Sequence, residues 1–478
     1  MKSEHDVLLD QDLDGALLAQ LHDAGGSSML NKEQILKDDS EYVLHGWGVI
    51  PRILVRGDRA TVTDIDGNKL IELWAQTAGV VSIGHRHPHW VQKITEQLNE
   101  ISHTLTDFVN EPRATLARRI AEIAPGKMKN NCMMYFSTGG SEANEANLKA
   151  AMILTGKTEV IATYWSYHGA TLSLMSLLAQ GYFRPQHLPR FPGFSAIPNA
   201  YCYRCYYGQE YPGCSFECAA ALEHHIRFNC NKGNALAFIL ELVPGNGGHQ
   251  EPPKEYFKVI REICDRNDVL LIVDEVQTGI GRTGEWWGCD YYDVSPDLMT
   301  AGKALGGGMP LSASVIRKDL VTEELINSQW HIVTFGGAPI SCAAGNAVLD
   351  VIEEEHLLDH VKKVAPVLRG RLEGMKEKYR LVGDVRGPGL FLGMELVRDR
   401  ETKEPAIDET AAIFGQGLER GIILPPNAIG GHGNVLKFKP VLNITEDEIH
   451  RGCDILEDLI KEQEATLGGK APAFAAGG

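Results

Sequence analysis

The run VLLIVD at residues 269–274 constrains the fold more than any other part of this chain. Val269–Val273 are consecutive apolar residues, several of them β-branched, and they show no helical spacing. A continuous apolar strand of this kind is typical of a parallel sheet that is covered on both faces. The sequence therefore predicts an α/β fold in which helices lie on both sides of a mainly parallel sheet.

The rest of the chain alternates in the same way. We expect further strands at 133–136, 160–165, 236–243 and 298–301, and helices at 88–101, 112–123 and 253–266. From residue 341 the pattern changes to long helices at 341–353, 356–378, 408–420 and 445–464, with strands at 391–397 and 435–440. We predict a large domain at 79–340 and a smaller α+β domain built from both chain ends, 1–78 and 341–478.

An acid and an amine are expected at the ends of neighbouring strands. Asp274 stands where the buried strand ends, and a carboxylate there is costly unless a cation or a hydrogen-bonding ligand meets it. Lys303 follows the short strand at 298–301 and precedes the glycines at 306–308. Because ligands gather at the carboxyl ends of parallel strands, we predict one crevice that holds both groups. The ordinary alternatives are a turn-forming Asp and a solvated Lys.

The turn STGGSEAN offers an anion site. Gly139 and Gly140 free the backbone after a strand, and Ser141 is expected to cap the helix that follows. Free amides at a helix start suit a phosphate. A simple strand-to-helix turn is the alternative.

The charge balance excludes some partners. Acidic side chains outnumber basic ones, 63 to 46, for a formal charge of -17. This disfavours nucleic acid and anionic membrane, because phosphate binding requires a basic face. The N-terminus lacks a signal pattern, and no apolar run reaches the roughly 18 residues of a membrane span. We expect a cytoplasmic protein.

Gly279, Gly281 and Gly284 spell the dinucleotide fingerprint G-x-G-x-x-G just past a strand. The fingerprint should begin a helix, but here it leads into the aromatic sequence EWWG at 285–288. We therefore interpret it as a glycine-rich loop and rank an oxidoreductase as a weak alternative.

Four of the ten cysteines crowd into the loop at 201–219. Cys202, Cys205, Cys214 and Cys218 are spaced C-x2-C-x8-C-x3-C. Short spacings in a reducing compartment predict a metal site with a structural role, either zinc or, slightly favoured, an iron–sulfur cluster. A set of reduced thiols is the alternative.

Taken together, the motifs resemble those of the class III aminotransferases, which are fold-type I enzymes that use pyridoxal 5′-phosphate. The resemblance covers nearly the whole chain after residue 45. Its most specific parts are DEVQTGIGRTG at 274–284 and the lysine in TAGKALGGGMPLSA at 300–313. Supporting matches are FSTGGSEANEANLKAA at 136–151, YHG at 167–169, ELVPGNGG at 241–248, TFGGAP at 334–339 and RGPGLFLGMEL at 386–396.

The resemblance implies roles around the cofactor ring. Lys303 would form the Schiff base with the cofactor aldehyde and carry the substrate proton, and Asp274 would pair with the pyridine nitrogen. Tyr167 and Val276 would cover the two faces of the ring, and Gln277 would reach its hydroxyl group.

It also implies roles around the cofactor phosphate. Gly140 and Ser141 would bind the phosphate, and Thr334 would reach it from the neighbouring subunit, so we expect a homodimer or a dimer of dimers. His168 and Glu241 complete the implied cofactor-binding set, with His168 as a hydrogen-bond partner.

Three positions depart from the family pattern. Ala170 and Asn246 replace an Arg and a Glu of members that act on glutamate or 4-aminobutyrate. Lys437 replaces the Arg that holds the substrate α-carboxylate in many members. Without arginine a second carboxylate lacks its bidentate partner. We expect an amine, an ω-amino acid or an α-amino acid as donor and a keto acid, best pyruvate, as acceptor. Trp74 is a candidate wall for an apolar donor.

Other reactions are compatible with the same scaffold. The segment at 383–406 also resembles decarboxylating dialkylglycine aminotransferases, and an amino-acid epimerase is equally compatible. Fold does not choose among them. A metal-bearing interaction protein without activity is a further alternative, which the joint presence of Lys303, Asp274 and the phosphate turn disfavours.

Overall fold

The structure is a computed structural model that describes residues 31–46, 48–75, 79–178, 190–425 and 432–467. Among these residues, 31–55 and 64–67 form one compact unit, and 56–63 and 68–467 form another. The first unit contains helix α2 (Lys32–Tyr42), which begins with the Asn31 side chain accepting a hydrogen bond from the backbone of Gln34.

A seven-stranded sheet is the centre of the second unit. In spatial order its strands are β4 (Cys132–Ser137), β10 (Ser312–Arg317), β9 (Leu298–Ala301), β8 (Leu270–Asp274), β7 (Ala235–Leu240), β5 (Glu159–Thr163) and β6 (Phe194–Ile197). β10 runs antiparallel to both of its neighbours, whereas β9, β8, β7, β5 and β6 are mutually parallel. The loops that follow the parallel strands therefore share one edge of the sheet.

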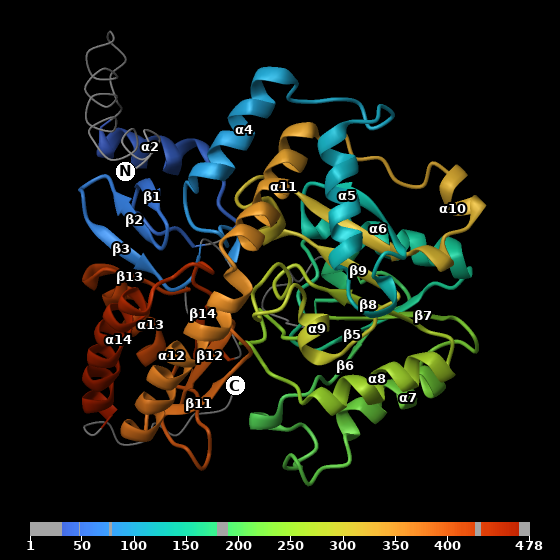
Figure 1. The fold of residues 1–478 in the computed structure, drawn as a ribbon. Helices are drawn as coiled ribbons and strands as arrows, with labels where there is room; N and C mark the ends of the chain where they lie inside the picture. The colour runs from blue at the N-terminus through green and yellow to red at the C-terminus, as the bar shows by residue number, and fades with distance from the viewer. Residues whose placement is uncertain (1–30, 47, 76–78, 179–189, 426–431, 468–478) are drawn as a thin grey trace. The chain divides into compact units, whose positions relative to one another are not determined.

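Helices cover both faces of this sheet. Helix α6 (Gly140–Thr155) packs on one face, and α7 (Glu217–Phe228) and α8 (Lys254–Arg266), which lie side by side, pack on the other (Figure 1). Strand β7 shows why: its six residues are all buried, and three of them enter each of two separate hydrophobic clusters. A strand that is buried on both faces needs an uninterrupted apolar sequence, and ALAFIL provides one.

Of two smaller sheets, the first combines strands from both ends of the chain and the second uses only strands after residue 381. One has the order β1 (Leu54–Asp58), β2 (Thr61–Asp64), β3 (Lys69–Glu72) and β13 (Ile422–Ile423), and the other β11 (Val382–Arg386), β12 (Leu392–Leu396) and β14 (Val435–Phe438). The remaining helices are α4 (Pro88–Glu100), α5 (Glu111–Ile123), α9 (Gly288–Tyr292), α10 (Glu323–Asn327), α11 (Pro339–Glu354), α12 (Leu357–Lys378), α13 (Ile407–Arg420) and α14 (Glu446–Leu467).

The predicted fold class is confirmed, and most predicted elements are present with ends shifted by a few residues. The strand predicted at 236–243 ends earlier, at Leu240, and the one predicted at 160–165 ends at Thr163 because Trp165 has a left-handed backbone. The glycine-rich segment at 279–284 forms turns and does not begin a helix. In the described ranges, no helix is long and apolar enough to cross a membrane.

Candidate active site

A cavity of about 350 Å³ lies where the strand-end loops meet. Loops after β4, β5, β8 and β9 contribute to its walls. Of the residues predicted from the sequence, the cavity brings together Gly140, Ser141, Tyr167, His168, Asp274, Val276 and Lys303. The acid and the amine expected at separate strand ends therefore line one cavity.

Asp274 is held in a fixed orientation at the end of β8. It is 4% exposed. Its Oδ2 accepts a hydrogen bond from Nδ2 of Asn144 at 2.8 Å and contacts Nδ1 of His168 at 2.9 Å, and its Oδ1 accepts from the backbone N–H of Val276 at 3.1 Å. His168 therefore carries its proton on Nδ1. A carboxylate oriented by several donors is suited to receive a cationic ring nitrogen.

Lys303 follows β9 and is partly buried at the cavity wall. Its backbone is left-handed, with φ of +44°, a conformation that costs energy for a residue with a Cβ. Burial lowers the pKa of its ammonium, and the carboxylates of Asp274 and Glu241 partly oppose that shift. The environment therefore favours the free amine, which is the nucleophilic form.

The start of α6 forms an open anion cradle. The N-cap is Gly139 and no side chain caps the helix, so the first amides are free. The prediction that Ser141 caps this helix is wrong: Ser141 lies inside the first turn, and its Oγ accepts the backbone N–H of Ala170 at 3.3 Å. A Cβ at Gly140 would lie 2.9 Å from Val276, and one at Gly169 would lie 2.5 Å from Ser141. Only glycine lets these loops approach so closely.

Glu241 holds the backbone of one cavity loop in place. Its carboxylate accepts the backbone N–H of Tyr167 at 2.8 Å and that of Gly245 at 2.9 Å, and it is 4% exposed. Burial raises the pKa of this carboxyl group. Glu241 thus ties the loop that carries Tyr167 to the end of β7, rather than lining the cavity itself.

Besides Glu241, four residues that were predicted to bind the cofactor or the substrate lie outside the cavity wall. Gln277 sits beside Glu241, with 3.5 Å between its Nε2 and the carboxylate, and its Oε1 accepts a hydrogen bond from Lys439. Thr334 is exposed and does not line the cavity. Trp74 and Lys437 belong to a separate buried cluster.

In that cluster the ammonium groups of two lysines lie over the indole ring of Trp74. The Nζ atoms of Lys437 and Lys439 lie 4.8 and 4.4 Å from the centre of the Trp74 ring. Burial lowers the pKa of Lys437 to about 7 and that of Lys439 well below its usual value, with the nearby cations adding to the shift for Lys439. Nζ of Lys437 is buried and has no hydrogen-bond partner among the described residues.

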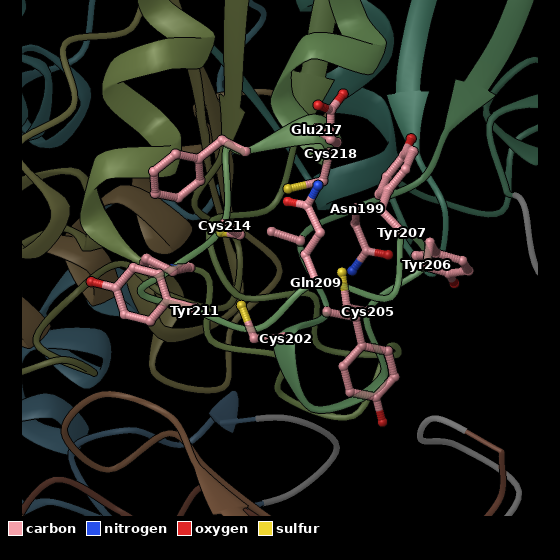
Figure 2. Close-up of a pocket in the computed structure, with 14 residues that line it drawn as sticks. Asn199, Cys202, Cys205, Tyr206, Tyr207, Gln209, Tyr211, Cys214, Glu217 and Cys218 are labelled. Carbon is pink, nitrogen blue, oxygen red and sulfur yellow. The ribbon is translucent and has the colours of Figure 1, made fainter.

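The four cysteines of the 201–219 loop line a common pocket together with several tyrosines (Figure 2). They are free thiols. Burial, reinforced by the neighbouring thiols, raises the pKa of Cys202 to about 11 and that of Cys218 to about 12. Metal ligands must be thiolates. In the described part of the chain, no group of three or more His, Cys, Asp or Glu side chains is arranged to hold a metal ion. The structure gives no support to the predicted iron–sulfur or zinc site.

Ion pairs anchor this loop instead. Arg204 contacts the buried carboxylate of Glu395 in β12 at 2.6 Å, and the Tyr201 hydroxyl donates to the same carboxylate. Arg386 contacts Glu395 at 2.8 Å. Burial alone would raise the pKa of Glu395, but the two guanidinium groups lower it below its usual value.

Two residues of the site were not predicted from the sequence. Asn144 lies one helical turn after Ser141, and this spacing on the phosphate-turn helix could have indicated it. Lys439 lies two residues after Lys437, so strand alternation could have placed both side chains on one face. Their hydrogen-bond partners depend on contacts between distant segments.

The sequence matches the family model described as aminotransferase class-III over residues 42–460. A leucine/methionine racemase of Thermococcus litoralis is 34% identical over 89% of this chain and 95% of its own length. An acetylornithine aminotransferase of Caldanaerobacter subterraneus is 33% identical over 89% of this chain and 98% of its own length. A crystal structure of a Bacillus anthracis aminotransferase superposes with a TM-score of 0.83 at 28% identity, covering 91% of this chain and all of the other.

Proposed function

The chain belongs to the class III aminotransferases, pyridoxal-phosphate-dependent enzymes, and we propose that it moves an amino group from an amine or amino-acid donor to a keto acid such as pyruvate. The observation that carries this proposal is the cavity that Asp274 and Lys303 share with the free helix start at Gly140. An oriented carboxylate, an amine whose pKa is lowered by burial and an anion cradle are the three groups that pyridoxal phosphate requires of a protein.

The cavity residues fit this cofactor. The amides at the start of α6 would hold the phosphate, and Asp274, fixed by Asn144 and His168, would hold the ring nitrogen. Tyr167 and Val276 would hold the ring between them. When bound, the cofactor supplies an aldehyde that condenses with amines and a cationic ring that withdraws electrons from the substrate carbon.

The protein's own groups then handle protons and orientation. Burial favours the free amine of Lys303, which would accept the substrate proton at Nζ and later return it to a different carbon atom. Asp274 would keep the ring nitrogen protonated, and Glu241 would keep the Tyr167 loop in place. In this proposal Thr334 reaches the phosphate of a neighbouring subunit.

A donor and acceptor screen with chiral product analysis tests the reaction. Alanine formed from pyruvate in proportion to the donor consumed would support transamination. A second candidate is racemisation, because the relative from Thermococcus litoralis is named a racemase and both reactions begin with loss of the same proton. Inversion of an amino acid in the absence of any keto acid would instead favour that reaction.

The Lys437→Ala substitution is expected to separate two kinds of acceptor. If Lys437 holds the substrate carboxylate, its removal should raise KM for pyruvate roughly 10- to 100-fold, which is the range of a lost charged hydrogen bond. KM for an aldehyde acceptor should change little, because an aldehyde has no carboxylate. Equal losses for the two acceptors would contradict this role, and Lys363→Ala on the exposed face of α12 is the control.

For the cysteine loop we propose a structural role that depends on Glu395 rather than on a metal. Glu395→Gln should lower the free energy of unfolding by about 3 kcal/mol, because it leaves Arg204 without its buried counter-charge and Arg386 with Asp384 as its remaining partner. Cys205→Ser should lower the free energy of unfolding by less than about 1 kcal/mol. Denaturant unfolding measures both. Stoichiometric zinc or iron in anaerobically purified protein would contradict this account.

A further inference from the structure

Three buried polar side chains lie in one row across the seven-stranded sheet. Thr300 in β9 is paired with Asp274 in β8 on one side and with Ser314 in β10 on the other. The side chains of paired residues point to the same face of a sheet, and all three are buried. Helix α6 packs against these three strands, and its buried residues Asn144 and Asn147 lie one turn apart. The helix therefore presents two side-chain amides to the row.

Hydrogen bonds join these side chains into one chain that ends at a carboxylate. The Ser314 hydroxyl donates to Oδ1 of Asn147. Nδ2 of Asn147 donates to Oγ1 of Thr300 at 2.7 Å, and the Thr300 hydroxyl donates to Oδ1 of Asn144 at 2.6 Å. Nδ2 of Asn144 donates to Oδ2 of Asp274 at 2.8 Å. Every donor in the chain therefore points toward Asp274.

Backbone carbonyl groups fix this direction. Nδ2 of Asn144 also donates to the carbonyl of His168 at 2.8 Å, and Nδ2 of Asn147 donates to the carbonyl of Met299 at 3.1 Å. Because a carbonyl oxygen can only accept, each amide must turn its nitrogen that way and use its Oδ1 as an acceptor. The Thr300 hydroxyl accepts from one amide and so has its own proton available for the other. The chain cannot reverse without turning acceptors toward each other.

Packing alone does not require this chain. Apolar side chains could fill the same space, as the residues of β7 do elsewhere in the sheet. Replacing both partners of a buried hydrogen bond by apolar groups of similar shape is nearly neutral or stabilising. Hydrogen bonds in series polarise one another, and the last bond of this series is made to a charged acceptor. The arrangement therefore strengthens the hold on the carboxylate of Asp274.

We propose that Thr300, Asn147 and Ser314 are positioning residues that act on the ring nitrogen of the cofactor through Asn144 and Asp274. Asn144 and Asp274 line the cavity, and the hydrogen-bond chain connects the other three residues to them. The chain holds the carboxylate in one orientation and favours its ion pair with a protonated ring nitrogen. This inference rests on the proposed function, because it concerns the ring that Asp274 would hold.

Equilibrium dialysis of the full-length protein, after removal of its cofactor, tests this role. The probes are pyridoxal 5′-phosphate and its 1-deaza analogue, in which a C–H group replaces the ring nitrogen. Both probes keep the aldehyde and the phosphate, so the ratio of their dissociation constants reports the contact to the ring nitrogen. The wild-type protein should prefer pyridoxal phosphate. Thr300→Val removes the hydroxyl but keeps the shape of the side chain, and it should reduce this preference roughly 3- to 10-fold, the worth of one hydrogen bond.

Three further variants make the test specific. Thr300→Ser keeps a hydroxyl and should retain the wild-type ratio. Ser314→Ala should change the ratio in the same direction as Thr300→Val but by a smaller factor, because Ser314 lies two hydrogen bonds further from the carboxylate. Thr410→Val is the matched control and should leave the ratio unchanged. Thr410 is a buried threonine in α13 whose hydroxyl donates to the carbonyl of Ala406.

A general structural defect would weaken the binding of both probes alike and leave their ratio unchanged. An unchanged ratio in Thr300→Val would therefore overturn the inference, as would equal binding of the two probes by the wild-type protein. If Thr300→Val does not fold, an unchanged ratio in Ser314→Ala is the overturning result. Failure of the proposed function is distinct, because the wild-type protein would then bind neither probe.

Discussion

Replacing Lys303 with alanine is expected to abolish the visible absorbance of the cofactor-loaded protein and to slow amino-group transfer by at least about 10⁴-fold. The variant loses both the amine that bonds to the cofactor and the group that moves the substrate proton. Burial keeps this amine available for both tasks by lowering its pKa. Absorbance spectra and single-turnover kinetics measure the two losses separately.

The matched control is Lys363→Ala, because Lys363 is an exposed lysine that pairs with Glu446 at the surface. It should leave the spectrum and the rate unchanged. A Lys303→Ala protein that keeps both its absorbance and more than about a tenth of its rate would mean that another amine carries the cofactor.

Replacing Asp274 with asparagine is expected to reduce kcat roughly 10²- to 10³-fold, the range seen when one preorganised electrostatic partner is removed. The neutral amide cannot keep a ring nitrogen protonated. It also places a donor where Asn144 and His168 already donate to Oδ2, at 2.8 and 2.9 Å. The cofactor should bind more weakly as well, which equilibrium dialysis measures.

Asp319→Asn provides the comparison for this variant, because Asp319 is an exposed carboxylate that pairs with Arg317. A rate for Asp274→Asn within about threefold of the wild-type rate would exclude the proposed ring contact, provided the melting temperature of the variant is unchanged.

The sequence predicted those parts of the site that depend on local pattern. The apolar strand before Asp274 and the glycines around Lys303 are local signals, and parallel strand ends share an edge, so the meeting of acid and amine followed from topology. The resemblance to a family supplied the expectations for the ring and phosphate contacts, which stay predictions. The cap at Ser141 was mispredicted because a glycine N-cap leaves no side-chain signal.

The parts that were not predicted depend on contacts between distant segments. The sequence pattern indicates Lys437 alone, although the ring of Trp74, more than 300 residues away in the sequence, contacts both Lys437 and Lys439. The cysteine spacing suggested a metal, but the fold gives the same loop ion pairs to Glu395. Spacing along the chain does not report which partner a distant strand provides.

The proposed function depends on which lysine bonds to the cofactor, and burial by itself does not single out Lys303. Burial lowers the pKa of Lys437 and Lys439 as well, so a lowered pKa is common to three lysines. Lys303 alone of the three lines the cavity with Asp274. Borohydride reduction of the cofactor-loaded protein, followed by peptide mass spectrometry, identifies the bonded residue. We predict the phosphopyridoxyl group on Lys303; finding it on Lys437 or Lys439, or on no lysine, would contradict the account.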